Sequence, residues 1–393
     1  MRVLLISHTC QSQTEGQPKA HALAAIPGVQ LRVITPEIWK HYGKWRPAEP
    51  PSEAKFEFSA QRVRWPWLGP AQDYLHWYPG LRRVLREFEP DLIDLWEEPW
   101  SAVSAHACWL REAVLPKARI ISETEQNLCK RLPPPFEQFR RYVLRRADFV
   151  VGRNAESIGV VRKKGYGGPA SVVPNAVDTQ LFKPMDRQAC RGALGLDGFV
   201  VGYVGRLVEE KGILDLIDAV GKCVSAVNLL IVGDGPLATE VNRRAALPQM
   251  QGRLRLLPAK PLAELPRIFN ALDVLALPSR TTRRWKEQFG RVIIEAHACG
   301  LPVIGSDSGA IPDVVGQGGL IVPEGSALDL QSAIDRLVNE PELARGFGKA
   351  GFEQVHAHCT WARVAERMHG IYRQALGDVQ MYNKPAPAVL HLK

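Results

Sequence analysis

Two carboxylates stand eight residues apart in the segment EQFGRVIIE, residues 287–295. The run from Arg291 onward is apolar and compatible with a helix. If that helix begins near Phe289 and Gly290, its backbone amides and the positive end of its dipole can hold an anion such as a phosphate. Glu287 would then face the ligand beside the phosphate. Glu295, two turns along, could accept hydrogen bonds from paired hydroxyls such as those of a ribose.

Two cations follow a predicted strand at residues 199–205. The chain continues as Arg206-Leu-Val-Glu-Glu-Lys211-Gly and then enters a predicted helix over 213–223. Both cations therefore emerge at the carboxyl end of a strand. A fixed guanidinium and a nearby ammonium can grip a diphosphate and neutralise the charge that accumulates when a nucleoside diphosphate departs. The arrangement predicts stabilisation of a leaving group without a metal.

The strands and helices that position these side chains can be predicted from the sequence. Short apolar, β-branched runs recur with helical stretches between them, which predicts parallel sheets. The pattern restarts after the turn-rich segment 173–184, so two successive α/β sheets are expected, with ligands bound beyond the carboxyl ends of their strands. The predicted strands are residues 3–7, 31–35, 92–96, 119–122, 148–152, 199–205, 228–233, 254–258, 274–278, 302–306 and 319–323.

Length and composition agree with this organisation. The 393 residues are 46% hydrophobic and 23% charged, which is typical of ordinary globular domains and excludes disordered, collagenous and coiled-coil proteins. We predict a first Rossmann-like domain over 1–175 that binds an acceptor and a second over 176–365 that binds a nucleotide-sugar. Residues 366–393 are predicted to form a terminal helix and tail that could return to the first domain.

The cysteines and the apolar runs indicate the compartment. Seven scattered cysteines without a C-x-x-C pair favour a reducing environment and no structural zinc. Neither a signal peptide nor a membrane-spanning run is expected from the sequence. The predicted location is the cytoplasm, with the inner face of a membrane as the alternative.

The second half of the chain resembles the retaining glycosyltransferases of family 4. These share the GT-B architecture, in which two Rossmann-like domains face each other across a cleft. The resemblance implies that a hexose moves from a nucleoside-diphosphate sugar to a saccharide or lipid-linked saccharide, in the synthesis of a polysaccharide or cell-envelope glycan. It rests on VPNAVD (173–178), GR-x4-KG (205–212), IVGDGP (231–236), PSR (278–280), the pair of glutamates and GLPVIGSDSGAIPDVV (300–315).

The resemblance also assigns roles to residues. It implies catalytic roles for Glu287, Arg206 and Lys211, and it implies no metal and no cofactor beside the donor substrate. The acceptor is expected to attack from the face that the leaving phosphate vacates, and that phosphate takes the proton. The residues implied in donor binding are Arg206 and Lys211 on the diphosphate, Lys260 near the base, Glu287 on the sugar, the amides of Phe289 and Gly290, Glu295 on the ribose, and Gly16 in the loop after the first strand.

The first half departs from the usual family pattern, in the part of the chain where the acceptor is normally chosen. His8 directly follows the first predicted strand, and Glu98 follows a strand within the cluster EEPW at 97–100. Glu123, Glu125, Gln126 and Asn127 follow another. These groups could hydrogen-bond sugar hydroxyls, and local capping of loops is the alternative interpretation.

A basic segment spans residues 130–164. It holds ten basic residues against three acids, and Arg140, Arg141, Arg145 and Arg146 are predicted to form the polar faces of an amphipathic helix. A solvated helix and contact with an anionic membrane both fit this pattern, and nucleic acid is not expected as a partner.

Three other functions could be expected of a chain with this pattern of strands. A dinucleotide-dependent dehydrogenase would need G-x-G-x-x-G after a first strand, and neither half supplies it. A nucleotide-sugar epimerase of the same fold would also bind a nucleoside diphosphate between two such domains. A non-catalytic sugar-binding scaffold is a third interpretation.

Overall fold

The structure is a computed structural model that describes residues 1–41, 44–64 and 72–378. The predicted tail of the chain beyond residue 378 lies outside the described residues. None of the helices in the described ranges has both the length and the apolar character needed to cross a bilayer.

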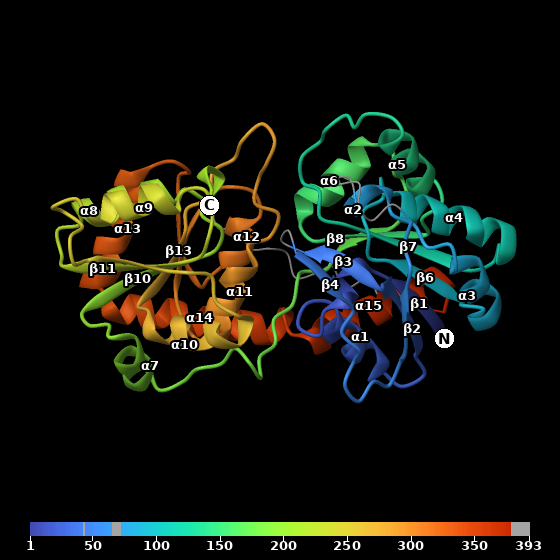
Figure 1. Cartoon of the computed structure of the whole chain (residues 1–393), viewed down its shortest axis with the longest axis horizontal. Helices are drawn as coiled ribbons and strands as arrows, with labels where there is room; N and C mark the ends of the chain where they lie inside the picture. The colour runs from blue at the N-terminus through green and yellow to red at the C-terminus, as the bar shows by residue number, and fades with distance from the viewer. Residues whose placement is uncertain (42–43, 65–71, 379–393) are drawn as a thin grey trace. The chain divides into compact units, whose positions relative to one another are not determined.

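The chain folds into two compact units, each built on its own sheet (Figure 1). The first unit comprises Met1–Pro174 together with the helix that begins at Trp361. The second comprises Asn175–Thr360. The change from one unit to the other at Pro174 and Asn175 falls inside the predicted turn-rich segment 173–184.

The first unit contains a seven-stranded sheet in which each pairing is parallel. Its strands, in spatial order, are β5 (Glu57–Gln61), β2 (Gln30–Pro36), β1 (Arg2–Ile6), β6 (Leu92–Leu95), β7 (Arg119–Thr124), β8 (Phe149–Gly152) and β9 (Ala170–Val172). A separate antiparallel hairpin is formed by β3 (Ile38–His41) and β4 (Lys44–Pro47). The helices are α1 (Gln17–Ala24), α2 (Gln72–Leu75), α3 (Leu81–Phe88), α4 (Ala102–Val114), α5 (Phe136–Leu144), α6 (Ala155–Lys163) and α15 (Trp361–Leu376).

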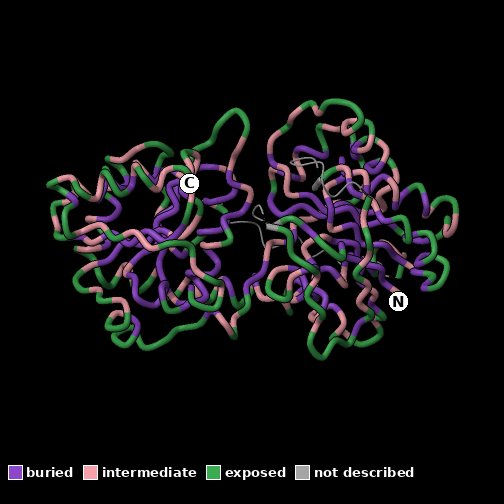
Figure 2. Tube along the Cα trace, in the orientation of Figure 1, coloured by how far each residue is buried: buried purple, intermediate pink, exposed green. Residues whose placement is uncertain are grey.

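Helices cover both faces of this sheet. The helices α3, α4 and α5 pack in succession, and their apolar side chains meet those of β1, β6 and β7 in one core. The last helix, α15, begins at Trp361, five residues before the predicted terminal segment 366–393, and it packs on α1 and β7. The central strands β1, β6, β7 and β8 therefore lie in the buried interior of the unit (Figure 2).

The second unit contains a six-stranded parallel sheet. The helices α8 and α13 pack together, as do α11 and α14 and also α7 and α10. In spatial order the strands are β12 (Leu254–Leu257), β11 (Val227–Val232), β10 (Phe199–Val204), β13 (Val274–Leu277), β14 (Val303–Ser306) and β15 (Gly319–Val322). The helices are α7 (Arg187–Leu194), α8 (Ile213–Lys222), α9 (Ala238–Ala245), α10 (Leu265–Ala271), α11 (Arg291–Ala298), α12 (Ile311–Val315), α13 (Ala327–Asn339) and α14 (Pro341–His358).

The predicted α/β class with two parallel sheets is confirmed, and each predicted strand is present. The sequence did not predict β5 and β9, which form the two edges of the first sheet. Because edge strands are less buried, they need no continuous apolar run. The sequences of β5, EFSAQ, and β9, ASV, contain no such run. Because each sheet is parallel, the loops that follow its strands gather at a single edge.

Candidate functional site

Glycines allow the loop after β10 to pack directly against the backbone of the neighbouring loops. A Cβ on Gly233, after β11, would lie 1.8 Å from the carbonyl oxygen of Gly205. Gly212 has φ +66°, and a Cβ there would lie 1.9 Å from the carbonyl oxygen of Pro278, after β13. No side chain fits at these contacts. The glycines therefore bring the loops of three adjacent strands into direct contact at the carboxyl edge of the second sheet.

At this edge Lys211 and Glu287 form an ion pair. The Lys211 ammonium lies 2.6 Å from Oε2 of Glu287, and the two side chains are only 14% and 9% exposed. The hydroxyl of Ser279 donates to the same carboxylate oxygen at 3.1 Å. The ring of Trp285 lies under the ammonium, with its centroid 4.8 Å away. The ammonium is therefore positioned by two neighbours, one of them charged.

The backbone of Glu287 is held as firmly as its side chain. Its carbonyl oxygen accepts a hydrogen bond from the amide of Ala310 at 3.1 Å. Gly309 has φ +59°, and a Cβ on it would lie 2.1 Å from that same oxygen. The loop after β14 thus packs against the loop that carries Glu287, and the carboxylate has a defined place.

The helix α11 begins where the sequence predicts. Gly290 is its N-cap with φ +81°, and Phe289 is buried in the core, so what Phe289 can offer a ligand is its backbone amide. Glu295 lies within the helix and is 9% exposed. Burial raises the pKa of the Glu295 carboxyl, and nearby Arg291 opposes that effect. No residue in the described ranges donates a hydrogen bond to it, so Glu295 can still accept hydrogen bonds from a ligand.

Arg206 and Lys260 lie at the same edge of the second sheet. Arg206 is exposed two residues after β10, and its carbonyl oxygen accepts a hydrogen bond from the buried Tyr203 hydroxyl at 2.7 Å. Lys260 is three residues after β12, and its ammonium lies 3.3 Å from a Glu264 carboxylate oxygen. The edge therefore presents two cations in addition to the paired Lys211, which suits a ligand with several negative charges.

In the first unit, His8 forms a pair with Glu97. The carboxylate of Glu97 accepts a hydrogen bond from the His8 backbone amide at 2.6 Å and lies 2.8 Å from its ring Nδ1. Trp39 stacks on the His8 ring with a centroid distance of 5.2 Å. Burial raises the pKa of Glu97, but His8 and His76 more than offset it, so the pKa is lowered. Glu97 is therefore ionised at neutral pH.

The next residue, Glu98, has the opposite character. Its carboxyl accepts hydrogen bonds from the Thr124 hydroxyl at 2.6 Å and the Glu125 amide at 2.8 Å. Burial nevertheless raises the pKa of Glu98 to about 8. Glu125 itself is 42% exposed and its carboxylate lies 3.5 Å from the Arg153 guanidinium. Two adjacent glutamates at the end of β6 therefore differ in charge at neutral pH.

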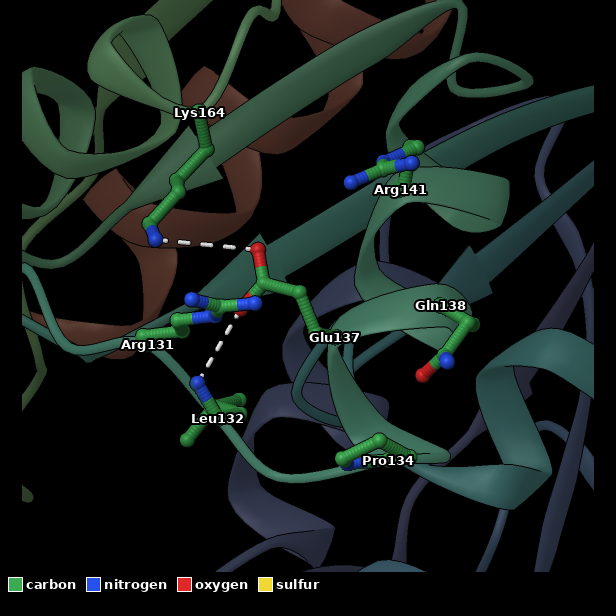
Figure 3. A pocket seen from close by; sticks show the side chains of 7 residues that line it. All are labelled: Arg131, Leu132, Pro134, Glu137, Gln138, Arg141 and Lys164. Carbon is green, nitrogen blue, oxygen red and sulfur yellow. Dashed lines mark hydrogen bonds and ion pairs between the residues drawn. The ribbon is translucent and has the colours of Figure 1, made fainter.

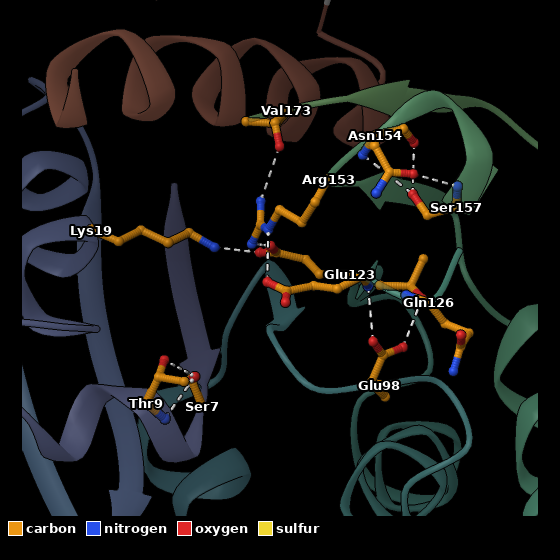
Figure 4. A network of polar contacts seen from close by, with 12 residues as sticks. Ser7, Thr9, Lys19, Glu98, Glu123, Gln126, Arg153, Asn154, Ser157 and Val173 are labelled. Carbon is orange, nitrogen blue, oxygen red and sulfur yellow. Dashed lines mark hydrogen bonds and ion pairs between the residues drawn. The ribbon is translucent and has the colours of Figure 1, made fainter. Parts of the chain in front are cut away.

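Glu123 lies inside a buried ionic network rather than at an exposed edge (Figure 4). It is 2% exposed and forms ion pairs with Lys19 of α1 and Arg153, which follows β8. Lys19 also contacts Asp94 at 3.1 Å, and the hydroxyl of Tyr372 in α15 donates to Asp94 at 2.6 Å. The network thus ties α15 to the sheet. The structure gives Glu123 two cationic partners, which favours a structural role.

The remaining predicted residues of the first unit make local contacts. The side-chain oxygen of Gln126 accepts a hydrogen bond from the Leu128 amide at 3.0 Å. The amide of Asn127 donates to Glu156 at 3.2 Å. Gly16 caps α1, and a Cβ there would lie 2.3 Å from the backbone of Thr9, so the loop after β1 needs glycine at this point.

The helix in the basic segment is present as α5, but one arginine does not lie on its polar face. Arg140 was predicted on the polar surface, and this prediction was wrong. It is 2% exposed, forms an ion pair with Glu137 and donates a hydrogen bond to the carbonyl oxygen of Lys130. A guanidinium can be buried when its donors find acceptors, and here one acceptor lies in the loop before the helix and the other in the first turn of the helix itself.

A pocket of about 420 Å³ opens beside α5 (Figure 3). Glu137 points into its middle, 3.6 Å from the ammonium of Lys164, and it accepts a hydrogen bond from the backbone of Leu132. Arg131 and Arg141 are exposed at the wall. The pocket therefore carries three cations and one carboxylate. Its lining is completed by Pro134 and Gln138.

Sequence reasoning missed several residues at the two edges. Ser279 stands in the PSR motif and Trp285 stands two residues before Glu287, so their positions in the sequence were available as signals. Glu97 belongs to the predicted cluster at 97–100, but its contact with His8 was not predicted, although the two residues follow neighbouring strands. Nothing in the sequence singled out Lys19 or Arg153 as buried, because their partners come from distant strands.

Known sequences are similar to a part of the chain that lies mostly in the second unit. Residues 163–354 match the family of glycosyl transferases group 1. A D-inositol 3-phosphate glycosyltransferase of Segniliparus rotundus is 35% identical over 217 residues, 52% of this chain and 47% of the relative. Another from Stackebrandtia nassauensis is 30% identical over 279 residues, 65% of this chain and 61% of the relative. The chain thus spans about half the length of the first and three fifths of the second.

Solved structures share the fold along nearly the whole chain. Sucrose-phosphate synthase from Thermosynechococcus elongatus has a TM-score of 0.73 at 22% identity, over 96% of this chain and 100% of that one. HepE of Anabaena in complex with UDP has a TM-score of 0.71 at 18% identity, over 95% and 100%. These neighbours confirm the predicted GT-B class of α/β fold.

Proposed function

We propose that this chain, whose residues 163–354 match the glycosyl transferases group 1, moves a hexose from a nucleoside-diphosphate sugar to a saccharide or lipid-linked saccharide. The transfer proceeds with retention of configuration and without a metal, and it serves the synthesis of a polysaccharide or cell-envelope glycan. The observation that carries the proposal is the ion pair of Lys211 and Glu287, which is largely buried at the carboxyl edge of the second sheet.

The charges at this edge suit a departing nucleoside diphosphate. Lys211 and the exposed Arg206 supply positive charge from the loop after β10. Fixed cations stabilise a leaving diphosphate because they need no reorganisation as its charge develops. Glu287 beside them can stabilise positive charge on the sugar ring, and buried Glu295 can accept hydrogen bonds from a ribose. Lys260 and the amides at the start of α11 complete the donor contacts.

The acceptor is proposed to bind at the carboxyl edge of the first sheet. His8, Glu98, Glu125 and Gln126 lie in loops that follow three neighbouring strands. The relatives from Segniliparus and Stackebrandtia are named for D-inositol 3-phosphate, so a phosphorylated polyol belongs in the acceptor screen. The basic segment 130–164 is proposed to contact an anionic membrane through the surface around the pocket beside α5.

The decisive experiment measures sugar transfer directly. Purified protein is first screened for thermal stabilisation by UDP, GDP, ADP and their glucose conjugates, since a ligand at about a hundred times its dissociation constant adds about 2.7 kcal/mol to stability. The stabilising nucleotide-sugar is then incubated with saccharides, lipid-linked saccharides and inositol 3-phosphate. Proton NMR of the product reports whether the anomeric configuration is retained.

Each result of this screen has a defined meaning. Transfer that persists in excess EDTA supports a metal-independent reaction, and loss of transfer in EDTA contradicts it. A donor that is epimerised and never transferred would indicate a nucleotide-sugar epimerase. A protein that no nucleotide stabilises would contradict the proposed function and leave a sugar-binding scaffold.

A further inference from the structure

We propose that the pocket beside α5 binds a phosphate monoester, a group that carries about two negative charges near neutral pH. The monoester belongs either to a soluble phosphorylated molecule or to the headgroup of a lipid such as phosphatidic acid. The inference goes beyond the proposed sugar transfer, since the pocket contains none of the residues assigned to donor or acceptor. It also refines the proposed contact of segment 130–164 with an anionic membrane, and only the lipid source rests on that contact.

Three cationic side chains line the pocket, and each comes from a different segment of the first unit. Arg131 lies in the loop between β7 and α5, Arg141 lies in α5, and Lys164 directly follows α6. Figure 3 shows the ammonium of Lys164 and the guanidinium of Arg141 pointing toward the space beside Glu137. Like charges held close together repel each other, and an anion between them removes that repulsion. The convergence of these segments therefore favours an anionic ligand.

The carboxylate of Glu137 does not take the place of that anion, because its charge is balanced by another residue. Arg140, which is 2% exposed and lies outside the pocket lining, forms an ion pair with Oε2 of Glu137. The amide of Leu132 donates to the same oxygen at 3.1 Å. The hydrogen bond from Arg140 is the main cause that lowers the pKa of Glu137 to about 2. The carboxylate therefore stays ionised and bound to Arg140, and the cations of the lining keep their positive charge toward the pocket.

The contact between Lys164 and Glu137 leaves the ammonium able to bind a ligand. Their closest atoms, Nζ and Oε1, lie 3.6 Å apart. This separation exceeds the N–O distance of a hydrogen bond, which is about 2.7–3.2 Å, so the pair is held by charge without a hydrogen bond. An ammonium has three donor hydrogens, and the Lys164 side chain is 18% exposed. A phosphate oxygen can therefore accept a hydrogen bond from Lys164 while the ion pair with Glu137 persists.

The size and the charge of the pocket select a monoester. Its volume of about 420 Å³ lies within the range of about 300–1,000 Å³ that is usual for small-molecule sites. The three cations and one carboxylate of the lining leave an excess of two positive charges. A phosphate monoester carries about 1.5–2 negative charges at pH 7, and guanidinium groups bind its oxygens in a bidentate manner. A phosphodiester carries a single negative charge and would leave the excess half-balanced.

The first arm of the test measures the binding of glycerol 3-phosphate, a soluble monoester, by isothermal titration calorimetry. The pocket variant combines Arg141→Gln with Lys164→Gln. It should bind glycerol 3-phosphate about 10–100-fold more weakly than the wild type, because it loses hydrogen bonds to a charged group.

A control variant with the same change in net charge combines Arg145→Gln with Lys163→Gln. Arg145 directly follows α5 and Lys163 is the last residue of α6, and both are exposed and lie outside the pocket lining. The control should bind glycerol 3-phosphate within about threefold of the wild type, since salt screens exposed charges that do not contact the ligand. The comparison of the two variants therefore separates the pocket from the general positive charge of segment 130–164.

The second arm measures sedimentation with two kinds of phosphatidylcholine vesicles. One kind contains phosphatidic acid, whose headgroup is a phosphate monoester, and the other contains phosphatidylglycerol, a phosphodiester, at equal surface charge. The wild type should bind the vesicles with phosphatidic acid about 10-fold more tightly, and the pocket variant should lose this preference. The control variant should lose a similar share of its affinity for both kinds of vesicle and keep the preference.

The two arms identify the source of the monoester. A loss that is specific to the pocket variant in the first arm alone identifies a soluble ligand, and the same result in the second arm alone identifies a lipid headgroup. A specific loss in both arms shows that the pocket accepts either source. If the double variant fails to fold, the single substitutions Arg141→Gln and Lys164→Gln replace it and are judged by the same criteria.

Two results would overturn the inference. In the first, the pocket variant and the control variant behave alike in both arms, so that the cations act only as surface charge and the proposed membrane contact stands without a pocket ligand. In the second, the wild type neither binds glycerol 3-phosphate nor prefers phosphatidic acid. Neither arm contains a nucleotide-sugar, so a failure of the proposed sugar transfer would be seen separately, in the transfer assay.

Discussion

The ammonium of Lys211 and the carboxylate of Glu287 are 2.6 Å apart although 76 residues separate them in the chain. The two residues come from loops after β10 and β13, which are adjacent strands of the second sheet. A diphosphate that binds the Lys211 ammonium either replaces Glu287 as its partner or binds beside it. The pair is therefore formed before the ligand arrives, which reduces the ordering that binding requires.

Removal of either partner should reduce transfer strongly. Lys211→Ala should lower kcat by about 10²–10³-fold, the typical effect of losing one group that stabilises developing charge. Glu287→Gln keeps the shape and removes the charge, so it should lower kcat while the donor still binds. Steady-state kinetics and isothermal titration with the donor measure the two effects.

The surface pair of Lys349 and Glu353 provides the control for this experiment. Its members are 79% and 65% exposed, so Lys349→Ala should change neither kcat nor the unfolding midpoint noticeably. Wild-type kcat in the Lys211→Ala variant would show that the leaving diphosphate does not depend on this cation.

Glu295→Gln should weaken donor binding while it increases the stability of the protein at alkaline pH. Burial raises the pKa of Glu295 in the folded protein above the pKa that it has in the unfolded chain. Once the pH exceeds the pKa of the unfolded chain, the wild-type protein therefore loses free energy of unfolding. The variant should therefore unfold at a higher temperature than wild type at pH 8 and at nearly the same temperature at pH 4. It should bind the donor about 10–100-fold more weakly, since it loses hydrogen bonds to a charged acceptor.

Calorimetry at the two pH values and titration with the stabilising nucleotide check both halves of the Glu295 prediction. Unchanged affinity would contradict the ribose contact and leave the stability result standing.

Glu98→Gln should make the protein more stable than wild type at neutral pH and leave its stability nearly unchanged at acid pH. The pKa of Glu98 is raised from 4.5 to about 8, so the group is mostly neutral at pH 7, and a glutamine can keep its contacts with Thr124 and Glu125. Between about pH 5 and pH 8 the Glu98 carboxyl is ionised in the unfolded chain but still neutral in the folded protein. The wild type should therefore lose stability relative to the variant as pH rises through this range. Thermal unfolding of both proteins from pH 5 to pH 9 measures the difference. Parallel curves would contradict the raised pKa.

The pocket beside α5 should attract anionic membranes. Arg131→Glu with Arg141→Glu changes the local charge by four units, so binding to vesicles of phosphatidylglycerol and phosphatidylcholine should weaken by several kcal/mol, at about 1 kcal/mol per cation near the surface. Sedimentation with vesicles at low and physiological salt measures this. Arg187→Glu, a change of an exposed arginine in α7, is the control. Equal binding by all variants would place any membrane contact elsewhere.

Much of the fold follows from local sequence alone. Buried parallel strands are continuous apolar runs, and such runs as VLLI and FVVGYV are visible without any knowledge of their neighbours. The turn glycines that crowd the loops at the carboxyl edge are equally visible. For this reason the predicted strands and the start of α11 agree with the structure.

The environments of charged side chains could not be read in this way. Arg140 and Glu123 look like surface residues in the sequence, yet both are buried. Arg140 is satisfied by Glu137 of its own helix and by a loop carbonyl, and Glu123 by Lys19 of α1 and Arg153 after β8. Desolvation and pairing depend on which segments meet in three dimensions. Glu97 and Glu98 illustrate the same point, since two adjacent and identical side chains have pKa values shifted in opposite directions.

The sequence by itself therefore determined the class of fold, the order of the strands along the chain and the loops that carry the candidate site residues. These depend on hydrophobic period and turn chemistry, which act over a few residues. Only the tertiary structure decided that Lys211 meets Glu287 and that His8 meets Glu97. Each contact joins loops of neighbouring strands, and the adjacency of strands is a property of the assembled sheet.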